Sequence, residues 1–204
     1  DVYKRQSMDN EEDDPGTTWN IDARTREPER MSPRMAWRAI QSALPQNAII
    51  SSDIGNNCAI GNAYPSFEEG RKYLAPGLFG PCGYGFPAII GAKIACPNTP
   101  VIGFAGDGAF GISMNEMTSC GRDDWPGITM VIFRNFQWGA EKRNTTLWYQ
   151  NNFVGTELNQ DFSYAKIAEG CGLKGVQVWS MEELTNELRL SCDEQKKGIT
   201  TFIE

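Results

Sequence analysis

The residues best suited to chemistry are a carboxylate and an amide that each follow an apolar segment. Asp107 lies just beyond the apolar residues 101–105, and Asn135 lies two positions after the apolar residues 129–133. If these segments are neighbouring parallel strands, the two side chains meet at one edge of the sheet. Mg²⁺ prefers a few protein oxygens together with phosphate and water. The pair therefore predicts a site for magnesium bound to a diphosphate.

Small residues around Asp107 favour the same interpretation. Gly106 and Gly108 permit a tight turn and the close approach of a ligand. Gly108 and Ala109 open the helix expected after the turn, where backbone N–H groups and the helix dipole favour an anion. The alternative is that Gly106-Asp107-Gly108 is only a strand-to-helix turn, and the position of Asn135 argues against it.

Apolar segments and helical patterns alternate along residues 33–204, and these elements must position the site. Apolar segments lie at residues 48–52, 101–105, 129–133, 175–179 and 200–203. Helices are expected from Ser32-Pro33 to Pro45 and at residues 88–95, 110–121, 164–170 and 181–190. This alternation predicts an α/β fold, a parallel sheet with helices on both faces. Ligands of such sheets lie beyond the carboxyl ends of the strands.

Composition narrows the class of protein. A formal net charge of -7 without a basic cluster argues against nucleic acid or membrane partners, since both reward clustered Lys and Arg. No apolar run reaches the roughly 18 residues that span a bilayer, so a cytoplasmic protein is expected. The sequence contains no histidine. Proton transfer would therefore come from carboxylates, a cofactor or another chain.

The two ends of the chain carry expectations of their own. Residues 1–32 are rich in charge and poor in apolar side chains, which is typical of a partly disordered leader and linker arriving from an upstream domain. The chain stops while an apolar segment is still running. We therefore expect residues 33–204 to be one binding domain, truncated at its carboxyl end and lacking the domains upstream.

The spacing of Asp107 and Asn135 resembles the cofactor motif of the thiamine-diphosphate enzyme family, which opens with Gly-Asp-Gly and closes on an asparagine. The resemblance implies the cofactors thiamine diphosphate and Mg²⁺ and the fold of the family's PP-type domain. It also implies that Asp107, Asn135 and the backbone carbonyl of Gln137 are the metal ligands. The family often closes on Asn-Asn, whereas this chain has Arg134 before Asn135. Only Asn135 is carried over as a ligand.

A second segment agrees with the family in order and position. Gly55, Asn56 and Asn57 follow the first apolar segment, where relatives place polar groups against the diphosphate. Asn56 and Asn57 are therefore candidate donors to the diphosphate. The alternative is that they form an asparagine-rich turn.

A glycine-rich segment at residues 79–87 looks like the loop that holds the pyrimidine ring of the cofactor in the decarboxylase-like branch. The resemblance implies that backbone groups of Gly80 and Cys82 bond the aminopyrimidine. The residue aligned with Cys82 wedges the cofactor into a bent shape and is usually a larger aliphatic side chain or methionine. Cys82 is smaller than the residues usual at this position and departs from that pattern.

Within this family, residues 16–204 are most similar to the sulfoacetaldehyde acetyltransferases, above all at residues 51–87, 103–122 and 130–158. The resemblance implies small-molecule substrates: sulfoacetaldehyde and phosphate give acetyl phosphate and sulfite. It also implies a homo-oligomer in the full-length enzyme. Relatives activate the cofactor with a glutamate on a partner domain, and no such domain is found here. The chain alone is expected to bind cofactor weakly and to turn over little or nothing.

The sequence identifies no catalytic residue. Lys142 and Arg143 are candidates to face the sulfonate and the phosphate. The plainer interpretation, that they are solvated charges on a helix, is favoured. Two other functions stay open: an acetolactate-synthase-like or 2-oxoacid decarboxylase reaction with the same cofactor, and a non-catalytic module that keeps only the fold.

Overall fold

Six parallel strands organise the part of the chain that the structure describes, which is residue 31, residues 33–66 and residues 72–204 of a computed structural model. The strands are β1 (Ile49–Ser52), β2 (Lys72–Leu74), β3 (Val101–Gly106), β4 (Thr129–Phe133), β5 (Lys174–Val176) and β6 (Thr201–Ile203). They pair in the order β2-β1-β3-β4-β6-β5, and every pair is parallel. The α/β fold with a parallel sheet is thus confirmed.

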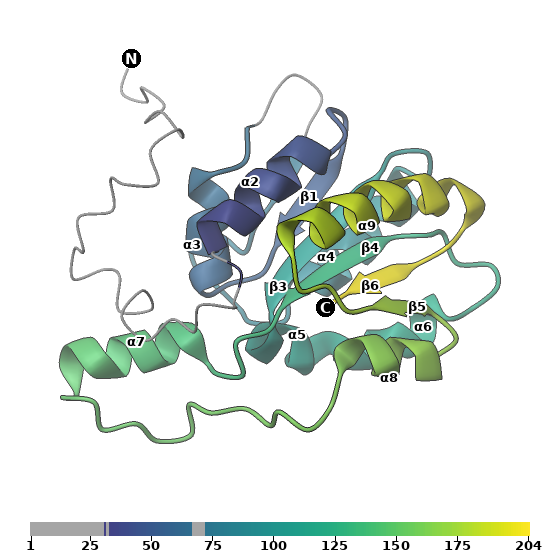
Figure 1. The fold of residues 1–204 in the computed structure, drawn as a ribbon. Coiled ribbons are helices and arrows are strands. Elements are labelled where there is room, and N and C mark those ends of the chain that lie inside the picture. Colours follow the sequence, from purple (N-terminus) through teal and green to yellow (C-terminus); the bar gives the residue numbers. More distant parts are fainter. Residues whose placement is uncertain (1–30, 32, 67–71) are drawn as a thin grey trace, which may run out of the picture. The chain divides into compact units, whose positions relative to one another are not determined.

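Helices cover both faces of this sheet (Figure 1). The helical segments are α2 (Pro33–Ala43), α3 (Asn56–Ala63), α4 (Gly85–Ala95), α5 (Asp107–Ser113), η1 (Met114–Glu116), α6 (Met117–Cys120), α7 (Gly139–Trp148), α8 (Tyr164–Gly170), α9 (Met181–Glu194) and η2 (Gln195–Lys197). Helices α2 and α9 lie side by side on one face, with α3 beside α2. Helices α4, α5, α6 and α8 pack on the other.

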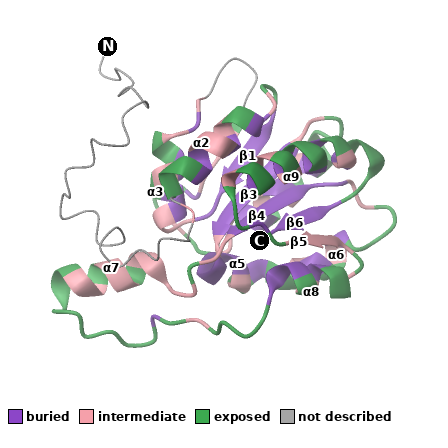
Figure 2. Cartoon of the chain, viewed as in Figure 1, coloured by how far each residue is buried: buried purple, intermediate pink, exposed green. Residues whose placement is uncertain are grey.

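The two faces have separate hydrophobic cores, because successive side chains of a strand point to opposite sides. Ile50 and Phe104 face α2 and α9, where Phe104 packs on Trp37 with ring centroids 4.8 Å apart. Ile49 and Ala105 lie in the other core. Figure 2 shows the central strands buried throughout. Such double-sided burial explains why these strands read as continuous apolar runs.

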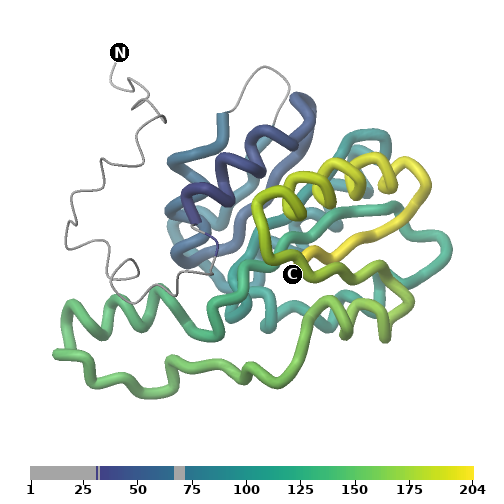
Figure 3. The backbone as a smooth tube through the Cα atoms, in the orientation of Figure 1, coloured from purple at the N-terminus to yellow at the C-terminus, as the bar shows by residue number. Residues whose placement is uncertain are grey.

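Several expected elements differ from the observed ones. The helix expected at residues 110–121 begins at Asp107 and is interrupted by η1, and the extended segment at 175–179 is shortened to β5. Helix α8 has the expected bounds. The pattern did not predict α3, β2 or α7. Helix α7 has no buried residue, and Figure 3 follows the chain from it through a long connection back to α8.

The leader and linker expected at residues 1–32 lie outside the described residues, except for Met31, which packs against the core beneath α2. Ser32, the expected cap of the first helix, also lies outside them. Among the described residues, no helix has the length and apolar character needed to cross a membrane.

Candidate cofactor and metal site

The carboxyl ends of β1, β3 and β4 lie next to one another at one edge of the sheet. Ser52 pairs with Phe104, and Gly106 pairs with Phe133, so the loops after these strands start at adjacent positions. From β1 the chain continues to β2 on one side, whereas β3 leads to β4 on the other. In open parallel sheets, ligands bind at the crevice where the strand order reverses in this way.

Asp107 lies at this crevice and reaches across to the end of β4. Its side chain is almost fully buried, with the residue 2% exposed. One carboxylate oxygen accepts a hydrogen bond from the N–H of Phe136 at 2.7 Å, and the other accepts one from Gly108 N–H at 3.1 Å. Burial raises the pKa of Asp107, and the bond from Phe136 and the charge of Arg134 offset part of that rise. The carboxylate is therefore directed to the backbone beside Asn135.

Asn135 and Gln137 follow β4 and are joined by a hydrogen bond. The amide oxygen of Asn135 accepts a hydrogen bond from Gln137 N–H at 3.3 Å. Gln137 forms an antiparallel bridge with Glu157 in which the hydrogen bonds belong to the flanking residues, Trp138 N–H to Thr156 and Leu158 N–H to Phe136. The N–H and carbonyl of Gln137 thus point away from residue 157, and the N–H is directed at the amide oxygen of Asn135.

Helix α3 brings Asn56 close to Asn135. A Cβ atom at Gly139 would lie 2.8 Å from the amide nitrogen of Asn135 and 3.2 Å from that of Asn56. Gly55 caps α3 with a φ of 112°, a conformation that suits glycine. Asn57 points elsewhere: it is buried, and its amide donates to Ser52 Oγ at 2.9 Å. The structure therefore groups Asn56, but not Asn57, with Asn135.

The glycine-rich loop is fastened to the end of β1 by Asp53, a residue to which the sequence pattern assigned no role. Its buried carboxylate accepts hydrogen bonds from the N–H groups of Gly83 at 3.1 Å and Gly85 at 2.6 Å. Burial raises the pKa of Asp53, and these backbone bonds oppose the rise. The sequence did carry a signal, because a charged residue directly follows a segment expected to be a buried strand. Gly80, with a φ of 58°, and the exposed Cys82 lie in the loop that Asp53 holds.

Gly108 is required where α5 begins, because the indole ring of Trp138 covers it. A Cβ atom at position 108 would lie 2.7 Å from Cε3 of Trp138. Ala109, the next residue of α5, is buried. Trp138 precedes α7, so this contact fixes the start of α7 against the start of α5.

We expect Gly108→Ala to lower the free energy of unfolding by about 1–3 kcal/mol, the usual cost of overpacking, as measured by urea denaturation. Gly106→Ala is the matched control, since a Cβ there meets nothing within 4 Å and its φ of -75° suits alanine. That control is expected to change stability by less than about 0.5 kcal/mol. Equal losses in the two variants would contradict the role of Trp138.

Lys142 and Arg143, the candidates for anion binding, lie on α7. Lys142 Nζ pairs with Glu157 Oε1 at 2.6 Å and lies 5.2 Å from the ring of Phe153. The charge of Lys142 is therefore compensated within the chain. Arg143 is half-buried on the same helix.

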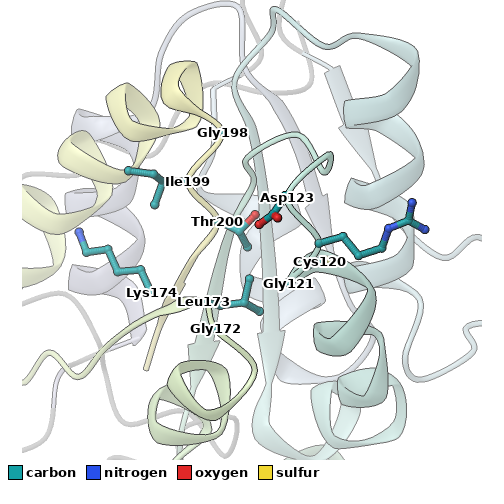
Figure 4. A pocket seen from close by; sticks show the side chains of 10 residues that line it. Cys120, Gly121, Asp123, Gly172, Leu173, Lys174, Gly198, Ile199 and Thr200 are labelled. Atoms are coloured by element: carbon teal, nitrogen blue, oxygen red, sulfur yellow. The ribbon is translucent and has the colours of Figure 1, made fainter.

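A polar groove of about 260 Å³ lies at the amino-terminal ends of the strands, opposite the candidate site (Figure 4). Its lining comes from the segments that precede β4, β5 and β6, including Asp123, Lys174 and Thr200. Its cations already have partners, since Lys174 binds two glutamates, at 2.6 and 2.8 Å. This groove is remote from the carboxyl ends of the strands, and none of the expected site residues lines it.

Comparison with known protein families identifies the family of this chain. The family model described as "Thiamine pyrophosphate enzyme, C-terminal TPP binding domain" matches residues 53–204. The chain belongs to the thiamine pyrophosphate enzyme family. The match begins at Asp53 and includes Asp107, Asn135 and Gln137. It therefore covers the loops that follow β1, β3 and β4.

Curated relatives within the family match nearly the whole of this chain. It is 75% identical over 203 residues to a probable sulfoacetaldehyde acetyltransferase of Rhizobium meliloti, covering 100% of this chain and 34% of that protein. It is 71% identical over 198 residues to a sulfoacetaldehyde acetyltransferase of Roseovarius nubinhibens, covering 97% and 33%. The chain thus spans about a third of the length of these relatives.

A solved structure has the same fold. The thiamine diphosphate-dependent 4-hydroxybenzoylformate decarboxylase of Rhodococcus jostii matches with a TM-score of 0.78 and 22% sequence identity, over 87% of this chain and 33% of that one. At this identity the likeness concerns the fold alone. It shows that the fold described above also occurs in a solved structure.

Proposed function

We propose that this chain is the segment of a sulfoacetaldehyde acetyltransferase that holds thiamine diphosphate and Mg²⁺. The whole enzyme converts sulfoacetaldehyde and phosphate into acetyl phosphate and sulfite. The observation that carries the proposal is the identity of 75% with the Rhizobium meliloti relative, which extends over 203 residues and so through all of the site.

The donor groups at the carboxyl edge fit these cofactors. A carboxylate from Asp107, an amide oxygen from Asn135 and a carbonyl from Gln137 are hard oxygen ligands of the kind that Mg²⁺ takes alongside phosphate. Asn56, grouped with Asn135 around Gly139, supplies an N–H donor for the diphosphate. The loop of Gly80 and Cys82 would hold the pyrimidine.

The chain's residues bind and orient, while the hard chemistry belongs to the cofactor. When bound, thiamine diphosphate supplies a carbon nucleophile that adds to the aldehyde. The carboxylate of Asp53 holds the glycine-rich loop through the N–H groups of Gly83 and Gly85. This attachment would limit movement of the pyrimidine ring of the cofactor. The overall reaction breaks a carbon–sulfur bond and forms a carbon–oxygen bond to phosphate. The aldehyde carbon is oxidised as its neighbour is reduced to a methyl group, so no external oxidant is needed.

We also propose that the full-length enzyme is a homo-oligomer and that it lies in the cytoplasm, which is a reducing compartment. Apolar side chains are exposed at the end of α7 and just after it, at Leu147, Trp148, Tyr149, Phe153 and Val154. Exposed apolar patches of this kind commonly mark protein interfaces. All six cysteines are free thiols, which suits a compartment in which disulfides are rare. Light scattering of the full-length enzyme tests the assembly.

A chimera tests the activity: this chain replaces the matching third of the Rhizobium meliloti relative. We expect equal amounts of sulfite and acetyl phosphate from sulfoacetaldehyde and phosphate, dependent on both thiamine diphosphate and Mg²⁺. The isolated chain is expected to give little or no product, because the relatives are about three times longer.

Pyruvate is the informative alternative substrate. The chain is 30% identical over 145 residues to the acetolactate synthase catalytic subunit of Saccharomyces cerevisiae. If the chimera formed acetolactate from pyruvate and released no sulfite from sulfoacetaldehyde, the acetolactate-synthase-like function would replace the one proposed. A chimera that fails to bind the cofactor at all would instead support a non-catalytic module.

A further inference from the structure

Arg134 is a buried cation beside the candidate metal site. Its side chain is 8% exposed although it directly precedes the exposed Asn135. The guanidinium carbon lies 4.5 Å from the ring centroid of Phe136, 4.7 Å from that of Phe162 and 5.3 Å from that of Tyr164. Three aromatic rings therefore surround the guanidinium group at distances that favour a cation.

One end of the guanidinium group is fully engaged away from the site. Nη1 donates to Glu204 Oε1 at 2.7 Å and to the carbonyl of Phe162 at 2.6 Å, and Nη2 donates to the carbonyl of Asn159 at 3.3 Å. Glu204 in turn accepts hydrogen bonds from Ser163 Oγ and Ala165 N–H at the start of α8. Arg134 thereby joins the end of β4 to the end of β6 and to α8.

The other end of the group faces Asp107. Arg134 Nε is buried without a hydrogen-bond partner among the described residues and lies 4.0 Å from Asp107 Oδ2. The hydroxyl of Tyr164, whose ring contacts the same guanidinium, donates to the backbone carbonyl of Asp107 at 2.9 Å. Arg134 thus connects Asp107 to Glu204, and Glu204 binds the start of α8. Tyr164 of α8 binds back to Asp107, which closes the circuit of contacts.

We propose that Arg134 is a positioning residue that sets the orientation of the Asp107 carboxylate toward the metal and so selects Mg²⁺. This rests on the proposed function, because it concerns the metal of the same site. Mg²⁺ demands near-octahedral geometry, whereas Ca²⁺ accepts irregular coordination. Without Arg134 the carboxylate keeps its bonds from the N–H groups of Phe136 and Gly108 but loses the buried cation beside Oδ2. A carboxylate held less firmly in this way should bind Mg²⁺ less well while losing little affinity for Ca²⁺.

The test compares Arg134→Met with Glu204→Gln in the chimera. Both changes break the same buried ion pair and disturb the same contacts of α8, but only Arg134→Met removes the group that faces Asp107. The measurement is the half-saturating concentration of Mg²⁺ and of Ca²⁺ for binding of thiamine diphosphate, by calorimetry, with urea denaturation in parallel. We expect Arg134→Met to lower the preference for Mg²⁺ over Ca²⁺ about tenfold, and Glu204→Gln to leave that preference unchanged.

A conservative variant keeps the test decisive if Arg134→Met does not fold. Arg134→Lys keeps a positive charge for Glu204 but has no N–H at the position of Nε, so it should also lower the preference for Mg²⁺. An unchanged preference in a folded Arg134 variant would overturn the inference alone. If the unsubstituted chimera bound neither metal together with thiamine diphosphate, the proposed function would fail, and this inference with it.

Discussion

Asp107→Ala is expected to abolish Mg²⁺-dependent binding of thiamine diphosphate, with a loss of affinity of at least about 100-fold. Residues that only support a metal ligand already change affinity 10–100-fold when replaced, so loss of a ligand should exceed that. Asp107 is the single carboxylate of the proposed ligand set, and the amide and carbonyl oxygens of Asn135 and Gln137 carry no formal charge. Calorimetric titration of the chimera with thiamine diphosphate and Mg²⁺ measures the loss.

Stability separates this effect from unfolding. Asp107→Ala leaves the N–H of Phe136 without its acceptor but also removes a carboxylate whose burial is unfavourable, as its raised pKa indicates. These contributions oppose each other, so urea denaturation should change little. Asp123→Ala, in the groove at the other edge of the sheet, is the matched control and should bind cofactor normally. Equal heats of binding in wild type and Asp107→Ala would rule out the proposed metal site.

The strands and the first two site residues could be predicted because local pattern and tertiary structure agree there. Strands β3 and β4 are buried on both faces, so apart from Thr129 they contain only apolar residues and glycine, and their ends are visible in the sequence. Parallel pairing then forces Asp107 and Asn135 to one edge. The sequence did not need to specify any long-range contact for this conclusion.

The missed helices have opposite physical reasons. Helix α3 contains three asparagines and a glycine, which are poor helix formers, and its contacts with α2 and β3 override that preference. Helix α7 buries no residue, so it has no apolar stripe to detect. Arg134 is harder still: the aromatic rings of Phe162 and Tyr164 that bury it are distant in sequence. Without them it appeared only as a departure from the family's Asn-Asn.

Among the proposed substitutions, Gln195→Leu is expected to lower the free energy of unfolding most. Gln195 lies at the amino-terminal ends of β3 and β4, opposite the candidate site. Gln195 is 5% exposed, and its side-chain amide makes four hydrogen bonds. Its amide nitrogen donates to the carbonyl of Val101 at 2.9 Å and to Thr129 Oγ1 at 2.8 Å, joining β3 to β4. Its amide oxygen accepts from Val101 N–H at 3.0 Å and from Lys93 Nζ at 3.3 Å.

Leucine has a similar size but satisfies none of these partners. Each buried polar group left unpaired costs about 1–3 kcal/mol, so urea denaturation should show a loss of roughly 3 kcal/mol or more even after the gain from burying leucine. Lys93 adds to the loss, because burial already lowers its pKa and, among the residues that the structure describes, the carbonyl of Thr99 is the acceptor that it would keep. Gln160→Leu, at an exposed position, should change stability by less than about 0.5 kcal/mol. Gln195 binds the start of β3, whereas Asp107 follows its end. The folded Gln195→Leu chimera should therefore keep its affinity for Mg²⁺ and thiamine diphosphate. A reduced affinity in fully folded protein would mean that the two ends of the strands are coupled.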